Sequence, residues 1–335
     1  MWWVTFLFAS IAGVHADQYC RALALCSGGS FGAYEAGAFA QLLKMLPAQE
    51  TQYNAVAGVS VGSLSSFMIA QYPMGQEIQA SAALTNLWNS INGSSSVYVD
   101  WPGGIITGLT VERGLVDNSP LRKLMEKNWS GKFQRNITVG TTNLNTGHFD
   151  NYNETTGANN AIEMSICSAS IPAFFPFQSF MGGNYVDGMV VYGIDIDSAV
   201  KRCYAVTGDY SKIIVDMLSD HHYALNQSNA NMKAYEAYER ANAIKKYDKG
   251  LFELYWALSA YPTVNFRYYI MPSTSLGAIC LNFTKVSIDY NYNLGIKDAN
   301  YIVSNNVYAR DIVNQWIADN GGIIKDRFKS KTIHI

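Results

Sequence analysis

The stretch Gly58-Val59-Ser60-Val61-Gly62 constrains the fold more than any other part of this chain. The short segment from Tyr53 to Val59 before it predicts a buried strand, and the segment from Val61 to Tyr72 after it predicts a helix. Glycine on each side of the serine allows strand and helix to approach closely, because neither glycine carries a Cβ atom. Ser60 is therefore expected to project from the carboxyl end of a strand, and it is our candidate nucleophile.

A glycine-rich loop, Ser27-Gly28-Gly29-Ser30-Phe31-Gly32, follows an apolar strand that is predicted over Arg21 to Cys26. Consecutive small residues there let several N–H groups point into one site and bind an anion. A phosphate or dinucleotide loop is the competing interpretation, but the Lys-Ser/Thr of a P-loop is absent and no acidic residue closes a strand about 20 residues later. Together with Ser60, the loop predicts an oxyanion hole formed by Gly28, Gly29 and Ser30.

A third motif, Asn184-Tyr185-Val186-Asp187-Gly188, carries a short strand that ends in an aspartate at a turn. Taken alone, the stretch is explained by a solvated turn aspartate. Beside the other two motifs, Asp187 becomes the candidate base for Ser60.

These three motifs, in this order and spacing, resemble the patatin-like phospholipase family. That family has a glycine-rich oxyanion loop after its first strand, a G-x-S-x-G elbow, and a distant Asp-Gly that completes a Ser-Asp dyad. The segments 33–37, 117–122 and 168–176 are similar to the family as well, so the resemblance covers roughly Arg21 to Ala199. The chain departs from the pattern at Ser27 in the triple glycine, at Phe31 where a basic residue is common, and at Met189 after the Asp-Gly.

The resemblance implies a lipid acyl hydrolase of the phospholipase A type that needs neither calcium nor a cofactor. Its substrate would be a phospholipid or another glycerolipid at a membrane or micelle interface, with Asp187 taking the proton of Ser60. Two alternatives stay open. One is an α/β-hydrolase esterase whose triad uses His221 or His222, and the other is a storage or binding glycoprotein of the same fold with little activity.

Alternating strands and helices predict one α/β domain, a three-layer α/β/α sandwich with a mostly parallel central sheet. Further strands are expected at 136–144, 203–207 and 212–218, with 148–152 a candidate partner of the first. Helices are expected at 32–46, 76–88, 159–169, 231–260 and 300–318, and from Ser119 as N-cap with Pro120 in the first turn. In the aromatic segment 251–261, core packing is favoured over a lipid-facing surface.

The stretch from Ile91 to Gly108 is rich in glycine, serine and aromatic residues, which indicates a long loop or lid. With Trp88, Tyr98 and Trp101, it is a candidate for contact with a lipid interface.

Several features predict entry into the secretory pathway, to the outside of the cell, a lumen or a vacuole. Residues 1–16 are mostly apolar and end in Val14-His15-Ala16, which indicates a signal peptide removed before a domain spanning 17–335. A buried N-terminal helix is the alternative. No segment is apolar for the ~20 residues that span a bilayer. Sequons that predict glycosylated surface loops occur at Asn92, Asn128, Asn136, Asn153, Asn226 and Asn282.

The cysteines and charges narrow the choice of partners. Five cysteines allow one or two disulfides, and we expect Cys203 to pair with Cys280 and Cys26 to remain a buried thiol. No cysteine or carboxylate spacing suggests a metal site. With a formal net charge of -2 and no basic run, nothing predicts nucleic-acid binding, while 49% apolar and 15% charged residues provide for a sizeable core.

Overall fold

The computed structural model describes residues 19–220, 231–277 and 279–319. The expected signal peptide at 1–16, the sequon at Asn226 and the histidines His221 and His222 lie outside these residues.

Within the described residues, the central sheet has eight strands in the order β10-β9-β1-β2-β5-β8-β7, with β6 also paired to β5. The strands β10, β9, β1, β2 and β5 are parallel, and β6, β7 and β8 are antiparallel to their neighbours. The expected mostly parallel sheet is therefore confirmed. The bounds are β1 (Cys20–Leu25), β2 (Ala55–Val59), β5 (Asn136–Asn143), β6 (Phe149–Asn153), β7 (Gln178–Phe180), β8 (Gly183–Asp187), β9 (Ile213–Leu218) and β10 (Asn265–Ile270).

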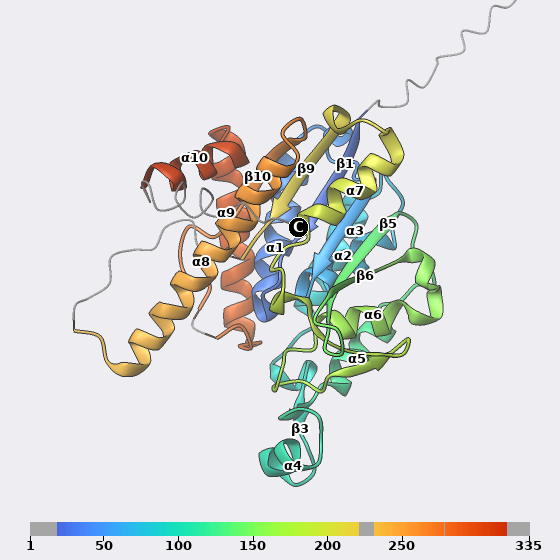
Figure 1. Ribbon diagram of the computed structural model, residues 1–335, viewed down its shortest axis with the longest axis vertical. Coiled ribbons are helices and arrows are strands. Elements are labelled where there is room, and N and C mark those ends of the chain that lie inside the picture. Colours follow the sequence, from blue (N-terminus) through green and yellow to red (C-terminus); the bar gives the residue numbers. More distant parts are fainter. Residues whose placement is uncertain (1–18, 221–230, 278, 320–335) are drawn as a thin grey trace, which may run out of the picture.

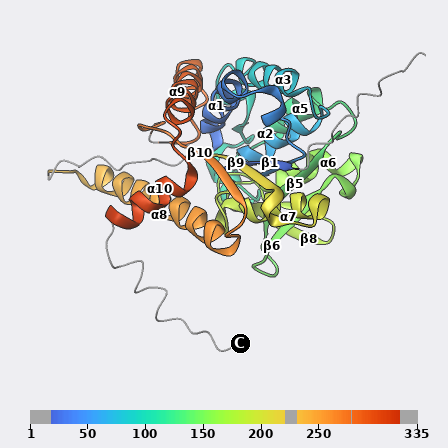
Figure 2. The same cartoon turned by 90° about the horizontal axis from the view of Figure 1, so that it is seen from above.

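Helices cover both faces of this sheet and form the outer layers of the expected sandwich (Figures 1 and 2). One face carries α1 (Gly32–Met45), α2 (Val61–Ala70), α3 (Glu77–Asn89), α5 (Ser119–Lys127), α6 (Ala161–Ser168) and α9 (Lys285–Ser304). The other carries α7 (Ile196–Thr207), α8 (Ala234–Ala260) and α10 (Ala309–Asp319).

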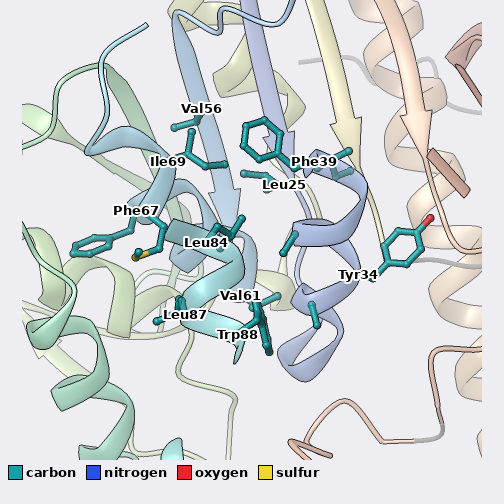
Figure 3. Close-up of a cluster of buried hydrophobic side chains, with 14 of the residues drawn as sticks. Leu25, Tyr34, Phe39, Val56, Val61, Phe67, Ile69, Leu84, Leu87 and Trp88 are labelled. Atoms are coloured by element: carbon teal, nitrogen blue, oxygen red, sulfur yellow. The ribbon is translucent and has the colours of Figure 1, made fainter. Parts of the chain in front are cut away.

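Strand β1 shows why both layers form. Successive side chains of a strand point to opposite faces, and every residue of β1 is buried. Leu25 joins Val56 in the cluster under α1, α2 and α3 (Figure 3). Leu23 belongs to the same cluster, whereas Ala22 and Ala24 face the α7 side. A strand buried on both faces is largely apolar, and apart from Arg21 the sequence of β1 has this pattern.

Three predictions about regular structure are wrong. Residues 203–207 form the end of α7, which Gly208 terminates in a left-handed conformation at φ 64°. A short apolar run cannot distinguish a strand from a buried helical segment. Residues 300–318 are divided between α9 and α10 rather than forming one helix. The N-cap of α5 is Asn118 rather than Ser119, although Pro120 does lie in the first turn.

The segment predicted as a loop or lid contains regular structure. It includes a 3-10 turn (Ser94–Ser96), β3 (Val99–Asp100) and the short helix α4 (Gly104–Thr110), and β3 pairs with β4 (Val116–Asp117). This β3–α4 unit projects from the body of the molecule at the lower end of Figure 1.

In the segment 251–261, Leu251, Leu254 and Leu258 are buried in the core, as expected, while Phe252 and Trp256 are partly exposed.

The cysteine pairing differs from the expectation. Cys20 forms a disulfide with Cys203, so the predicted Cys203–Cys280 pair is wrong. The reason is tertiary: α7 packs against β1 and brings the two Cα atoms to 5.4 Å, whereas the carbonyl of Cys280 lies against the glycine loop after β1. Cys26 is buried and forms no disulfide, as predicted.

Candidate active site

Ser60 occupies the sharp turn between β2 and α2, with φ 55° and ψ -123°. Such a backbone is strained for a residue with a side chain, and nucleophile elbows show this strain. The glycines on either side have no room for a side chain: a Cβ atom on Gly58 would lie 2.1 Å from the Gly62 carbonyl oxygen, and one on Gly62 would lie 2.4 Å from that of Leu25. The close approach of β1, β2 and α2 therefore requires both glycines.

Strand β5 brings Ser60 and Asp187 together. Gly140 pairs with Val59 of β2 on one edge and with β6 on the other, and Thr141 pairs with β6 and with Asp187 of β8. It follows that β2 and β8 occupy the same edge of β5, one after the other. The residue that follows β2 and the residue that ends β8 must then meet.

The two side chains do meet. Ser60 Oγ donates a hydrogen bond to Asp187 Oδ2 at 2.6 Å, and the N–H of Met189 donates to Oδ1 at 2.9 Å. Asp187 is fully buried. Burial raises the pKa of Asp187 to about 7, although the hydrogen bonds from Ser60 and Met189 and the charge of Lys249 oppose the rise. A carboxyl group with this pKa can accept and return a proton near neutral pH.

The last residue of α6 and the segment directly after it hold both ends of this pair in place. The N–H of Ser60 donates to Ser168 Oγ at 2.8 Å, and Ser168 Oγ donates to the Gly140 carbonyl at 2.7 Å. The N–H of Asp187 donates to the Ser170 carbonyl at 2.8 Å. The sequence gave no role to Ser168; its only signal was the position within the family-like segment 168–176.

The glycine loop lies beside the pocket, and Gly29 lines it together with Ser60. Among the described residues, no hydrogen-bond acceptor is recorded for the N–H groups of Gly28 and Gly29. The N–H of Ser30, by contrast, donates to the Cys280 carbonyl at 2.7 Å. Two of the three expected oxyanion donors thus remain available in this arrangement, and the third is occupied.

Two lysines of α8 lie where the chain departs from the family pattern. The ammonium of Lys246 stands over the ring of Phe31, 5.8 Å from its centroid, which is within cation–π range. Lys249 Nζ donates to the Met189 carbonyl at 2.6 Å. A distant helix therefore supplies positive charge near both Phe31 and the turn after Asp187.

The cavity beside Ser60 has a free volume of about 50 Å³ and an almost entirely apolar lining. Its walls come from α2, α3, α5 and the segments before β7 and α9, and include Leu64, Leu84, Trp88, Met125, Phe175 and Phe283. Such a lining suits a hydrocarbon chain rather than a polar substrate. The free volume is small, so side chains must move to admit a long chain.

Histidine and metal chemistry have little support in the described part of the chain. His148, the one histidine there, is exposed in the β5–β6 connection. In the same residues, no cluster of three or more His, Cys, Asp or Glu side chains could hold a metal ion.

The predicted sequons differ in their surroundings. Asn92 and Asn282 are exposed in loops, as expected for glycan acceptors. Asn128, Asn136 and Asn153 are half-buried, and the last two lie within β5 and β6.

Together, the parallel α/β sheet and the serine–aspartate pair at its edge define a hydrolase-type site. A family model described as "Patatin-like phospholipase" matches residues 23–200, more than half of the chain. The chain belongs to the patatin-like phospholipase family, which implies a serine lipid hydrolase. A search of curated proteins found no match.

Three solved structures are among those similar to this chain. VipD from Legionella pneumophila matches with a TM-score of 0.42 and 11% identity over 86% of this chain and 67% of its own. Two structures of the ExoU–SpcU complex from the type III secretion system of Pseudomonas aeruginosa match with TM-scores of 0.29 and 0.32 and identities of 13% and 12%. They cover 72% and 93% of this chain but only 53% and 61% of the matched chain. At these scores, no conclusion about activity rests on them.

None of the helices in residues 19–220, 231–277 and 279–319 is long and apolar enough to cross a membrane.

Proposed function

We propose that this chain is a lipid acyl hydrolase that releases fatty acids from phospholipids or other glycerolipids through Ser60 and Asp187. The observation that carries the proposal is the direct 2.6 Å hydrogen bond from Ser60 Oγ to Asp187 Oδ2 beside an apolar cavity. Family membership supports the same class of reaction.

In the first half-reaction, Asp187 accepts the Oγ proton while Oγ of Ser60 bonds to the ester carbonyl carbon. The carbonyl oxygen becomes negative, and the N–H groups of Gly28 and Gly29, with the N-terminus of α2, stabilise it. Such a donor contributes about 3–4 kcal/mol in other enzymes. The ester C–O bond then breaks, and the departing alcohol oxygen takes the proton from Asp187.

In the second half-reaction, water gives a proton to Asp187 and attacks the acyl carbon of acyl-Ser60. The bond to Oγ breaks, the fatty acid leaves, and Oγ recovers the proton from Asp187. Neither half-reaction requires calcium or a cofactor. Ser30 would join the donors only if its N–H left the Cys280 carbonyl.

The direct contact between Ser60 and Asp187 favours this dyad over a triad, because a triad places a histidine between serine and aspartate. Replacing both His221 and His222 with alanine tests the alternative. Near-full activity supports the dyad, and loss of activity in a folded protein contradicts it.

The decisive experiment is fatty acid release from phospholipid, galactolipid and neutral glycerolipid micelles without calcium. Ser60→Ala should abolish release. Ser66→Ala should not, since Ser66 lies in α2, the helix that follows Ser60, and its buried Oγ has no hydrogen-bond partner among the described residues. An acyl-enzyme that still forms at the normal rate in Asp187→Asn contradicts the base assignment. No release from any lipid by folded wild type favours the storage or binding alternative.

We also propose that the chain enters the secretory pathway, with a signal peptide cleaved after Ala16 and one domain over 17–335. The Cys20–Cys203 disulfide supports an oxidising compartment, and the exposed Asn92 and Asn282 support glycan attachment. N-terminal sequencing of the exported protein and a mass shift on enzymatic deglycosylation test both points. An N-terminus at Met1 contradicts the first point, and an unchanged mass contradicts the second.

A further inference from the structure

The β3–α4 unit has an unusual concentration of exposed apolar side chains. The exposed fractions are 59% for Ile105, 75% for Ile106, 69% for Leu109 and 74% for Val111. Single exposed apolar residues are common on protein surfaces, but four within seven positions form a patch of the kind that marks an interaction site.

This patch lacks charge. No Asp, Glu, Lys, Arg or His occurs from Trp101 to Val111. Asp100 precedes the stretch, and Glu112 and Arg113 follow it, so two negative charges and one positive charge leave the flanked stretch without the excess of positive charge that an anionic surface would attract. Arg113 is directed back to the body, where its guanidinium stands over the Phe177 ring at 4.7 Å. A surface of this composition suits an apolar or zwitterionic partner rather than an anionic one.

Close contacts within the unit brace the patch. A Cβ atom on Gly108 would lie 2.6 Å from the Leu115 carbonyl oxygen, so α4 packs closely on the chain that returns from it. Trp101 Nε1 donates to the Gly114 carbonyl at 2.9 Å and closes the base of the unit.

The base of the unit adjoins the wall of the cavity beside Ser60. Val97, Leu121 and Phe175 line that cavity. The N–H of Leu121 donates to the Val97 carbonyl at 3.1 Å, and the N–H of Val116 donates to the carbonyl of Phe174, the neighbour of Phe175, at 3.1 Å. The base of the unit is therefore bonded to the chain segments that carry cavity-lining residues. The unit projects from the end of the molecule toward which the parallel strands point, which is the end that carries Ser60 (Figure 1).

The residues that the sequence suggested for lipid contact are not the exposed ones. Trp88 is 4% exposed and lines the cavity, and Tyr98 packs on the rings of Phe174 and Phe175.

We propose that Ile105, Ile106, Leu109 and Val111 of the β3–α4 unit insert into the surface of a zwitterionic lipid bilayer and so place the cavity mouth against the substrate. This docking deepens the proposed function and rests on it for the identity of the substrate. Short apolar elements that penetrate only the boundary between headgroups and acyl chains bind membranes in this manner.

The test measures sedimentation of the full chain with phosphatidylcholine vesicles in a Ser60→Ala background, so that no lipid is consumed. Adding Ile106→Ser and Leu109→Ser should lower the partition coefficient at least about tenfold. Val206→Ser is the matched control, because Val206 is an apolar side chain that is 57% exposed. It lies near the end of α7, where Cys203 is bonded to Cys20 at the start of β1, and this is the end of the parallel strands opposite to Ser60. The control should bind as the parent does, and salt should change binding little.

A second readout separates docking from chemistry. With Ser60 intact, the Ile106→Ser/Leu109→Ser protein should hydrolyse a short-chain, water-soluble ester at the normal rate and lose activity only on vesicles. Unchanged vesicle binding by this variant overturns the inference. Absence of vesicle binding by a protein that hydrolyses the soluble ester overturns the inference and leaves the proposed function intact. Vesicle binding that depends on Ile106 and Leu109, without hydrolysis of any ester, overturns the proposed function alone.

Discussion

The protonation state of Asp187 should control the pH dependence of hydrolysis. Burial raises the pKa of Asp187 to about 7 from its ordinary value of 3.8, and only the ionised carboxylate can accept the Ser60 proton. About one tenth of the molecules would be ionised at pH 6 and about nine tenths at pH 8, so kcat/KM should rise about tenfold between these values. A carboxyl group at its ordinary pKa would be ionised at both, and the rate would not change.

Lys249 should affect the pH at which kcat/KM rises, which we call the pH limb. Its charge lowers the pKa of Asp187, and its Nζ holds the Met189 carbonyl in the turn after Asp187. Lys249→Met removes the charge, so the pKa of Asp187 should rise and the limb should shift to higher pH. Lys249→Arg keeps the positive charge, so the limb should stay at its wild-type pH. Lys245→Met, an exposed position on the same helix, should leave it unchanged.

The assay is kcat/KM for a soluble ester that does not titrate, measured from about pH 5.5 to about pH 9. A flat profile between pH 6 and 8, or a rate that falls as pH rises there, would refute a buried aspartate base. A limb that Lys245→Met and Lys249→Met shift equally would refute the role of Lys249.

Three further predictions concern stability, each measured by urea unfolding. Ser168→Ala leaves the buried Ser60 N–H without its acceptor and should cost about 1–3 kcal/mol; a cost no larger than that of Ser66→Ala would contradict this. Cys20→Ser opens a disulfide that spans 183 residues and should lower the free energy of unfolding by about 3–5 kcal/mol. An unfolding curve of the wild type that does not change when reductant is added would contradict this. Because the pKa of Asp187 is higher in the folded chain than in the unfolded chain, the folded state loses stability as pH rises from about 4 to about 7. The stability of Asp187→Asn relative to wild type should therefore increase over this window, by up to about 4 kcal/mol, and a constant difference would contradict the raised pKa.

Local patterns predicted the first two-thirds of the chain well. The strand–turn–helix at Ser60 follows from glycines that act through their own neighbours. Strand β1 follows from a short run that is apolar after Arg21 and is closely followed by glycines. The C-terminal third was less predictable. The strand β10 carries Arg267, whose charge interrupts the apolar pattern. It is buried there because Asp216 of β9 accepts from its Nε at 2.9 Å, a partner 51 residues away that no local pattern reveals.

The sequence by itself determined the candidate nucleophile Ser60, its partner Asp187, the glycine loop at 27–32 and the alternation that builds a parallel sheet, because each depends on residues adjacent in the chain. Only the tertiary structure decided that β2 and β8 share one edge of β5 and that Cys203 pairs with Cys20. It decided that the N–H of Ser30 donates its hydrogen bond to the Cys280 carbonyl. It also decided that Ile106 and Leu109 are exposed while Trp88 is buried. These contacts join residues far apart in sequence, and strand register and helix packing fix them only once the whole chain has folded.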